Sequence, residues 1–452
     1  MKNIELSRLP GTGHDHGEEA VIRETRRRQR VAGSGTVAPQ APPVVPADPE
    51  VVIRQARARQ RRRRRRAAAL VALALVAGAG AWLAIGRPGS AKPARARPGG
   101  PVPRVKVISR AGPSRYYVAY DARVVKPGKL TPGTLVSVRT ATNTPGRPIR
   151  LAIDGAMAVT PDGKTIYVGT GGTVTPVSTA TGTPGKPIQI RTGGAPFGIV
   201  VTPDGRTAYV SGLAGAITPI RTATGTPGKP IHIGPGVLPA VIAVTPDGKT
   251  AYVATTGGTV TPINTATGKP GKPMHVGPRP YQIAVTPDGK TAYVLRSNAV
   301  TPISTATNTA GKPIRLPGAG CCFIAITPDG KTAYVGGNGA VTPISTATGT
   351  VGKPVRIGIP AEEIAFTPDG KTAYAANAEG PIGTVVPIST ATNTPGKPIR
   401  IGLAAAIAIT PDGKTLYAAA QNKVVPISTA TNTPGKPIRL RYGIPAGIVI
   451  TP

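Results

Sequence analysis

The ten residues VTPDGKTAYV at Val285–Val294 decide the fold of this chain, because close copies of them recur along it. The same decapeptide stands at Val244–Val253. Near copies, about 41 residues apart, begin at Val159, Val201, Ile326, Phe366 and Ile409. Self-similarity at such a period is typical of a supersecondary unit that buries its apolar surface only against copies of itself.

The second part of each period is clearest in AVTPISTATNTAGKPIRL at Ala299–Leu316, and it occurs eight times. A whole period therefore contains four short runs rich in Val, Ile, Thr and Tyr, separated by Pro-Asp-Gly and by Thr/Gly/Asn-rich turns. Such runs are typical of β-strands, and no stretch after Gly112 has helical periodicity. Four antiparallel strands in about 40–45 residues predict the blade of a β-propeller, which is an all-β fold.

The two ends of the repeat array complement each other. The array begins with a TAYV-like run at Arg115–Ala119 that has no IAVTPDG run before it, and it ends with an IAVTP-like run at Gly447–Pro452. Pairing these two runs would close the ring and remove two exposed sheet edges. The sequence therefore predicts eight blades closed by the N- and C-terminal strands, with seven blades as the alternative.

The stretch IAVTPDGKTAYVATTGGTVTPINTATGKPGKP at Ile242–Pro273 resembles the YVTN β-propeller repeat family, a relative of WD-repeat and lactonase-type propellers. The resemblance covers residues 113–452. It implies a propeller, and propellers of this kind serve as surface proteins, binding scaffolds and occasionally enzymes. Ser, Arg or Asn stands before each TAT where the family usually has an aspartate, so a site that uses this aspartate is not carried over.

The first part of the chain has a different composition. Residues 1–66 are charged and Pro/Gln-rich, which predicts a disordered basic tail. Residues 67–86 contain no charge and are long enough for a transmembrane helix, and residues 87–112 form a Pro/Gly/Arg-rich linker. Nine arginines between Arg54 and Arg66 precede the apolar segment, so the tail is predicted to be cytoplasmic and the propeller extracellular or periplasmic. A cleaved signal peptide is the alternative to this single-pass cell-membrane anchor.

The net charge of +36 raises the question of partners. We interpret the arginine run as a topology signal that contacts anionic lipid, in preference to a nucleic-acid-binding site. Basic residues also recur in the predicted fourth strand and the preceding turn of each blade. This basic rim discourages sheet-edge pairing and is suited to an anionic envelope polymer or lipid headgroups.

Repeated polar residues have a structural interpretation. The Pro-Asp-Gly aspartates accept hydrogen bonds in a turn whose glycine supplies a positive φ, and the repeated tyrosines pack between blades. His232 and His275 occupy equivalent places in predicted fourth strands, where most blades have Arg. The adjacent Cys321 and Cys322 are predicted to be two buried thiols, because neighbouring Cα atoms are too close for an unstrained disulfide. A strained vicinal disulfide is the alternative.

One face of the propeller differs from blade to blade. In a four-stranded antiparallel blade the second–third loop and the connection to the next blade lie at one end, and here both vary. We predict that this variable face binds the ligand, in a pocket of mixed polarity. The candidate residues just before the innermost strands, with Arg296 from a second–third loop, are Asp154, Phe197, Leu238, Arg279, Tyr281, Gln282, Arg296, Glu362 and Glu363.

The predicted function is a non-catalytic binding or scaffold module, anchored in the membrane, for an envelope protein, a glycan or a polymer. No catalytic residue, cofactor or metal site is predicted. One alternative is a metal-dependent lactonase-like hydrolase or a lyase that uses Glu362 and Glu363, with Asp154 and Asn298 as further ligands. The other is a transmembrane sensor with an external ligand-binding domain.

Overall fold

The structure is a computed structural model that describes residues 115–120, 123–126, 129–131, 133–151, 153, 156–190, 196–212, 215–234, 239–317, 323–377, 383–402, 404–440 and 445–451. These ranges contain strands and turns and no helix, hence no helix that could cross a membrane. The predicted tail, transmembrane helix and linker lie outside the described residues, and so do Asp154, Leu238, Cys321 and Cys322.

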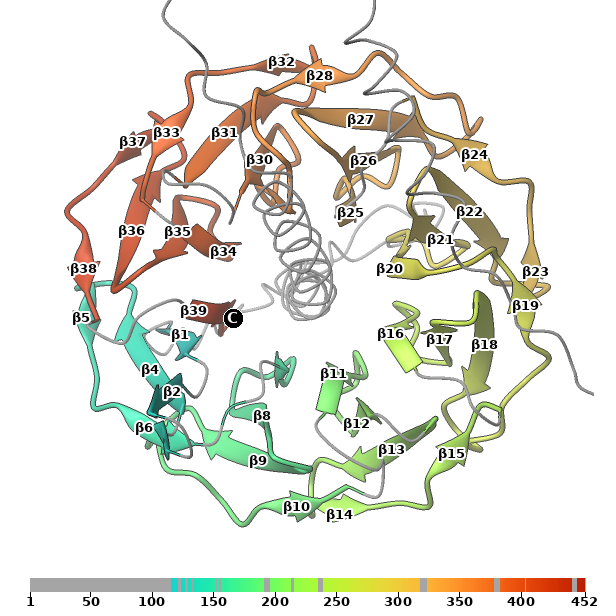
Figure 1. Cartoon of the computed structure of the whole chain (residues 1–452), viewed down its shortest axis with the longest axis horizontal. Coiled ribbons are helices and arrows are strands. Elements are labelled where there is room, and N and C mark those ends of the chain that lie inside the picture. Colours follow the sequence, from blue (N-terminus) through green and yellow to red (C-terminus); the bar gives the residue numbers. More distant parts are fainter. Residues whose placement is uncertain are drawn as a thin grey trace, which may run out of the picture. The chain divides into compact units, whose positions relative to one another are not determined.

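The described strands form an eight-bladed β-propeller (Figure 1). Eight sheets follow one another around a ring, and the innermost strand of each sheet contacts the innermost strand of the next. The innermost strands are β39 (Pro445–Ile450), β7 (Met157–Val159), β11 (Pro196–Val201), β16 (Pro239–Val244), β20 (Pro280–Val285), β25 (Phe323–Ile326), β29 (Glu363–Phe366) and β34 (Ala404–Ile409). In this order they define blades 1 to 8.

Each blade adds three strands outward, paired antiparallel as the four-run repeat predicts. The second strands are β1 (Arg115–Tyr120), β8 (Thr165–Thr170), β12 (Thr207–Gly212), β17 (Thr250–Thr255), β21 (Thr291–Arg296), β26 (Thr332–Gly336), β30 (Thr372–Ala376) and β35 (Thr415–Ala420). The third strands are β4 (Gly133–Arg139), β9 (Thr173–Ser178), β13 (Ala216–Arg221), β18 (Thr259–Asn264), β22 (Ala299–Ser304), β27 (Ala340–Ser345), β31 (Thr384–Ser389) and β36 (Lys423–Ser428).

The outermost strands are short, and the turns before some of them contain a further pair of strand residues. The fourth strands are β6 (Ile149–Leu151), β10 (Ile188–Gln189), β15 (Ile231–His232), β19 (Met274–His275), β24 (Ile314–Arg315), β28 (Val355–Arg356), β33 (Ile399–Arg400) and β38 (Ile438–Arg439). The turn strands are β5 (Thr144–Pro145), β14 (Thr226–Pro227), β23 (Thr309–Ala310), β32 (Thr394–Pro395) and β37 (Thr433–Pro434). Blade 1 also contains a hairpin of β2 (Arg123–Lys126) and β3 (Lys129–Thr131) that the repeat pattern did not predict.

Closure of the ring is confirmed at the predicted place. Strand β39, at the end of the chain, pairs antiparallel with β1, and Tyr116 lies opposite Ile450 while Val118 lies opposite Ile448. The Thr451 hydroxyl adds a hydrogen bond of 2.9 Å to the Arg115 carbonyl. The first blade is thus made from both ends of the array, and the eight-blade prediction is correct.

The core of the propeller lies between the blades. Side chains of successive residues in a strand point to opposite faces, so Tyr116 and Val118 pack toward blade 8 while Tyr117 and Ala119 pack toward blade 2. Each hydrophobic cluster among the described residues combines two neighbouring blades in this way. Both faces of a blade are therefore buried, which explains why TAYV runs are continuously apolar.

Candidate functional site

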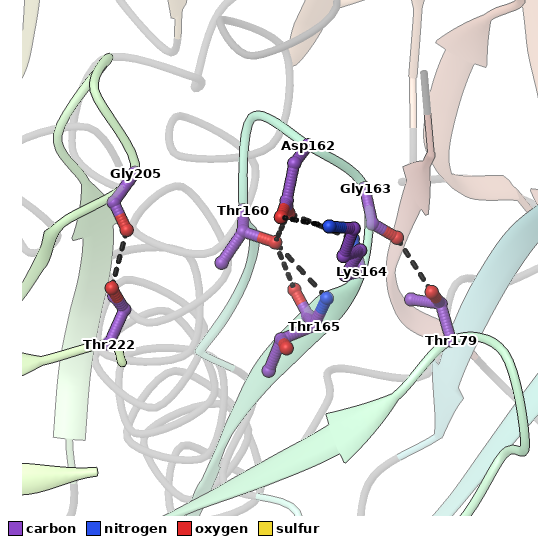
Figure 2. Close-up of polar contacts among 8 residues, drawn as sticks. All are labelled: Thr160, Asp162, Gly163, Lys164, Thr165, Thr179, Gly205 and Thr222. Carbon is purple, nitrogen blue, oxygen red and sulfur yellow. Dashed lines mark hydrogen bonds and ion pairs between the residues drawn. The ribbon is translucent and has the colours of Figure 1, made fainter. Parts of the chain in front are cut away.

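The Thr-Pro-Asp-Gly turn, followed by Lys in six blades and by Arg206 in blade 3, satisfies its own polar groups (Figure 2). In blade 2 the Thr160 hydroxyl donates to Asp162 Oδ1 over 2.6 Å, and the same oxygen accepts the Lys164 N–H over 3.0 Å. The Thr165 N–H donates to the Thr160 hydroxyl oxygen, and Gly163 has φ +69°. The equivalent aspartates of the other turns make the same two hydrogen bonds.

These bonds keep the turn carboxylates charged. The pKa values of Asp369 and Asp412 are lowered, and the hydrogen bond from the threonine hydroxyl is the largest cause of this shift. In Asp162 partial burial raises the pKa, but the hydrogen bonds from Thr160 and Lys164, with the Lys164 charge, outweigh it and the pKa is lowered. A carboxylate held in this way serves the turn, so the predicted structural role of the seven aspartates is supported.

The two repeated turns of a blade lie together at one end. The Thr179 hydroxyl, in the third–fourth turn of blade 2, donates to the Gly163 carbonyl in the first–second turn over 2.7 Å. Thr222 and Gly205 repeat this contact in blade 3 (Figure 2). The invariant turns therefore form one face of the propeller, which we call the turn face.

The repeated tyrosines link neighbouring blades. The Tyr293 hydroxyl of blade 5 donates to the Thr346 carbonyl of blade 6 over 3.0 Å. The Tyr417 hydroxyl of blade 8 donates to Asn143 Oδ1 of blade 1 over 2.9 Å, which completes the circle. Burial raises the pKa of Tyr252, Tyr374 and Tyr417 to about 12. These side chains are inter-blade contacts, as predicted.

The variable face lies at the opposite end of each blade, and blade 5 brings three of the predicted binding residues, Arg279, Tyr281 and Arg296, together there. Pro280, which follows Arg279 and precedes Tyr281, is the Cα partner of Arg296 across β20 and β21. The Tyr281 hydroxyl shares a hydrogen bond of 3.2 Å with the hydroxyl of Ser297. We name Gly277, Arg279, Tyr281, Arg296 and Ser297 the blade-5 corner. Sequence reasoning missed Gly277 and Ser297, although GPRPY and RSN have no counterpart in the other blades.

Gln282 and Glu363 occupy the same position of their blades, four residues before the turn threonine, and bond in the same way. Gln282 Oε1 accepts the Ile324 N–H of the next inner strand over 2.7 Å, and Glu363 Oε2 accepts the Ile407 N–H over 2.8 Å. Their side chains are 5% and 6% exposed. Burial raises the pKa of Glu363 to about 8, against the smaller lowering effect of the Ile407 N–H. Both residues join neighbouring inner strands. Both lie within a strand where the sequence placed them before it, and the same correction applies to Tyr281 and Phe197. Arg296 is the last residue of β21, where the sequence placed it in the loop that follows.

The remaining candidates are separated around the ring. Phe197 lies in β11 of blade 3 and Glu362 precedes β29 of blade 7, and both are partly exposed. Asn298 is on blade 5, so blade 6 separates it from Glu362. Within the described residues no group of three or more His, Cys, Asp or Glu side chains could hold a metal ion. His232 and His275 are exposed in fourth strands, as predicted.

The basic rim is exposed along its whole length. Its members from the turns are Arg147, Lys186, Lys229, Lys272, Lys312, Lys353, Lys397 and Lys436, and its arginines from the fourth strands are Arg150, Arg315, Arg356, Arg400 and Arg439. Five lysines of the Pro-Asp-Gly turns pair with their own aspartates at 3.7–4.0 Å. Such exposed pairs contribute little to stability.

Comparison with known proteins supports the fold. No protein-family model and no curated protein matches the sequence, so membership of the YVTN family stays a prediction. Among solved structures, the dihydro-heme d1 dehydrogenase NirN in complex with DHE is similar over 74% of this chain and 74% of its own, with 16% identity and a TM-score of 0.63. Kuenenia stuttgartiensis hydrazine synthase has 22% identity over 63% of this chain and 94% of its own, with a TM-score of 0.49. The likeness to NirN, at 16% identity, is one of propeller fold alone.

Proposed function

We propose that this protein is a membrane-anchored, extracytoplasmic binding module that captures an envelope protein, glycan or polymer on its variable face without catalysing a reaction. The apolar segment at residues 67–86 would anchor it, and the arginines before that segment would keep the tail in the cytoplasm. The propeller would then present its variable face outside the membrane.

The observation that carries the proposal is the contrast between the two faces. On the turn face the repeated threonine and aspartate groups are engaged in hydrogen bonds that the turn itself needs. On the variable face, blade 5 gathers two arginines, a tyrosine and a serine that the repeat does not require. Polar and aromatic side chains collected outside the structural pattern are typical of a binding surface.

Capture of envelope material by the purified full-length protein tests the proposal. Arg279→Ala and Tyr281→Ala on blade 5, and Glu362→Ala on blade 7, should each reduce the amount captured. Lys312→Glu and Lys353→Glu, which reverse charges at the rim of the turn face, serve as matched controls and should leave capture unchanged. If the rim variants lose capture and the blade-5 variants retain it, the turn face is the binding surface and the proposal is wrong.

Protease accessibility tests the membrane arrangement separately. In cells whose outer envelope has been made permeable while the cytoplasmic membrane stays closed, an added protease should degrade the propeller and leave the tail at residues 1–66 protected. Protection of both segments would contradict the proposed topology.

A further inference from the structure

The guanidinium of Arg296 lies against the backbone of Gly277, and its Nε has no hydrogen-bond partner among the described residues. A Cβ atom built on Gly277 would stand 3.1 Å from Cζ, Nε and Nη1 of Arg296, so the guanidinium plane lies flat over this glycine. Nε is buried and has no hydrogen-bond partner within the described part of the chain. A buried guanidinium N–H without a partner is costly. Arg296 as a whole is partly exposed, and an anionic oxygen of a ligand is the natural complement of its guanidinium.

Arg279 has an unusual backbone conformation beside it. Six non-glycine residues in the described ranges have positive φ, and five of them are asparagines, the residue type that tolerates this region best. Arg279 is the sixth, with φ +54°, and its side chain is exposed. Strained backbone of this kind persists where the surroundings enforce it and is concentrated at binding and active sites.

Two hydroxyl groups complete the blade-5 corner. Tyr281 is partly exposed, and its hydroxyl is held 3.2 Å from that of Ser297, the residue after Arg296. Hydroxyl groups can donate and accept, so this pair suits a ligand that itself carries hydroxyl groups.

No described carboxylate neutralises the two arginines. Neither Arg279 nor Arg296 takes part in an ion pair within the described ranges. The aspartate of blade 5, Asp288, lies in the turn at the other end of the blade and accepts hydrogen bonds from Thr286 and Lys290. The corner is thus positively charged without an internal counter-ion.

The geometry points to a binding site for an acidic saccharide, in which the two arginines bind a carboxylate or phosphate oxygen of the sugar and the Tyr281–Ser297 pair binds its hydroxyls. This inference rests on the proposed binding function and names the ligand class of the same face. A carboxylate and a phosphate both present a pair of anionic oxygens that one guanidinium can contact at the same time. The experiment therefore uses one sugar with a carboxylate and one with a phosphate, to tell which group the site binds.

Isothermal titration of the full-length protein with small probes tests the inference. Digalacturonate supplies the carboxylate, glucose 1-phosphate supplies the phosphate, and maltose is the neutral control. The variants come from the protein itself: Arg296→Thr introduces the residue that blade 4 has at the equivalent position, Thr255, and Arg279→Asn introduces the residue found at the other left-handed positions. Lys312→Gln removes the same single charge from the turn face of blade 5.

We expect saturable binding of at least one acidic sugar and none of maltose. Arg296→Thr and Arg279→Asn should each weaken binding at least tenfold, and Lys312→Gln should change it less than twofold. Because asparagine suits the left-handed backbone better than arginine, Arg279→Asn should unfold at the same temperature as the wild type or higher, so lost binding would not reflect lost folding.

Two results would overturn the inference. One is no saturable binding of either acid to the wild type. The other is equal weakening of binding by Lys312→Gln and Arg296→Thr, which would indicate general electrostatic attraction.

Envelope capture separates failure of the acidic-saccharide inference from failure of the proposed function. If Arg279→Ala loses capture while neither acid binds, the face is correct and the ligand class is wrong. If the acid binds but no envelope material is captured, the proposed function fails and the site remains.

Discussion

Replacing Glu363 with glutamine should make the propeller more stable at neutral and basic pH. Glu363 Oε2 accepts one hydrogen bond, from the Ile407 N–H, and the side chain is 6% exposed. Gln282 makes the equivalent bond to Ile324 with a neutral amide. Glutamine at position 363 can therefore keep the inter-blade bond without placing a charge in a buried site.

The magnitude follows from the pKa. Burial raises the pKa of Glu363 from its ordinary value of 4.5 to about 8. Because the folded pKa lies above the unfolded value, the folded state keeps its proton between these pH values while the unfolded state loses it. Stability then falls as pH rises, by about 1.4 kcal/mol for each pH unit in this window. The buried Glu363 carboxyl thus lowers the free energy of unfolding by about 3 kcal/mol at pH 7 and by on the order of 5 kcal/mol above pH 8.

Thermal unfolding followed by circular dichroism between pH 5 and 8.5 checks this prediction. For a domain of this size each kcal/mol shifts the midpoint by roughly 1.5 °C. Glu363→Gln should therefore unfold about 5 °C above the wild type at pH 7, with the difference close to zero near pH 5. Gln282→Glu is the reciprocal control and should introduce the same fall in stability with rising pH. Parallel pH profiles for the wild type and Glu363→Gln would refute the reasoning.

Three further predictions concern the ring. Tyr293→Phe keeps the packed ring but removes the hydrogen bond to the Thr346 carbonyl, so urea denaturation should show a loss of about 1 kcal/mol, and no loss would mean that the bond contributes nothing. Asp288→Ala removes the acceptor of two turn hydrogen bonds and should lose about 1–2 kcal/mol at pH 7. The pKa of Asp288 is lowered in the folded state. Its contribution to the free energy of unfolding is therefore present above its unfolded pKa and is lost as pH falls through the folded pKa. The difference in stability between Asp288→Ala and the wild type should accordingly shrink below about pH 4. Deleting residues 441–452 removes β39 and leaves β1 with a free edge. Light scattering should then detect self-association of the shortened protein through that edge. A shortened protein that stays monomeric and is as stable as the full chain would contradict closure of the ring by β39.

The variable face shows where sequence reasoning reached its limit. The prediction that Arg279, Tyr281, Gln282 and Arg296 belong to one end of a blade followed from loop order alone, and pairing of Pro280 with Arg296 agrees with it. Their separate roles could not be predicted. The Gln282 side chain accepts a hydrogen bond from a backbone N–H of the next blade, 42 residues away, whereas the Tyr281 hydroxyl shares a hydrogen bond with Ser297 of its own blade.

The amino-acid sequence by itself determined the blade, the number of blades and the closing pair of strands. These follow from local rules. Each blade repeats the same turn residues, and the side chains of a strand alternate between its two faces. The incomplete runs at the two ends of the array leave exposed sheet edges unless they pair with each other. The tertiary structure alone decided that Glu363 is a buried inter-blade acceptor, that Arg296 lies flat on Gly277, and that Arg279 adopts φ +54°. Each of these depends on the packing of a neighbouring blade or on the path of an unrepeated loop, and no periodic pattern along the chain encodes either.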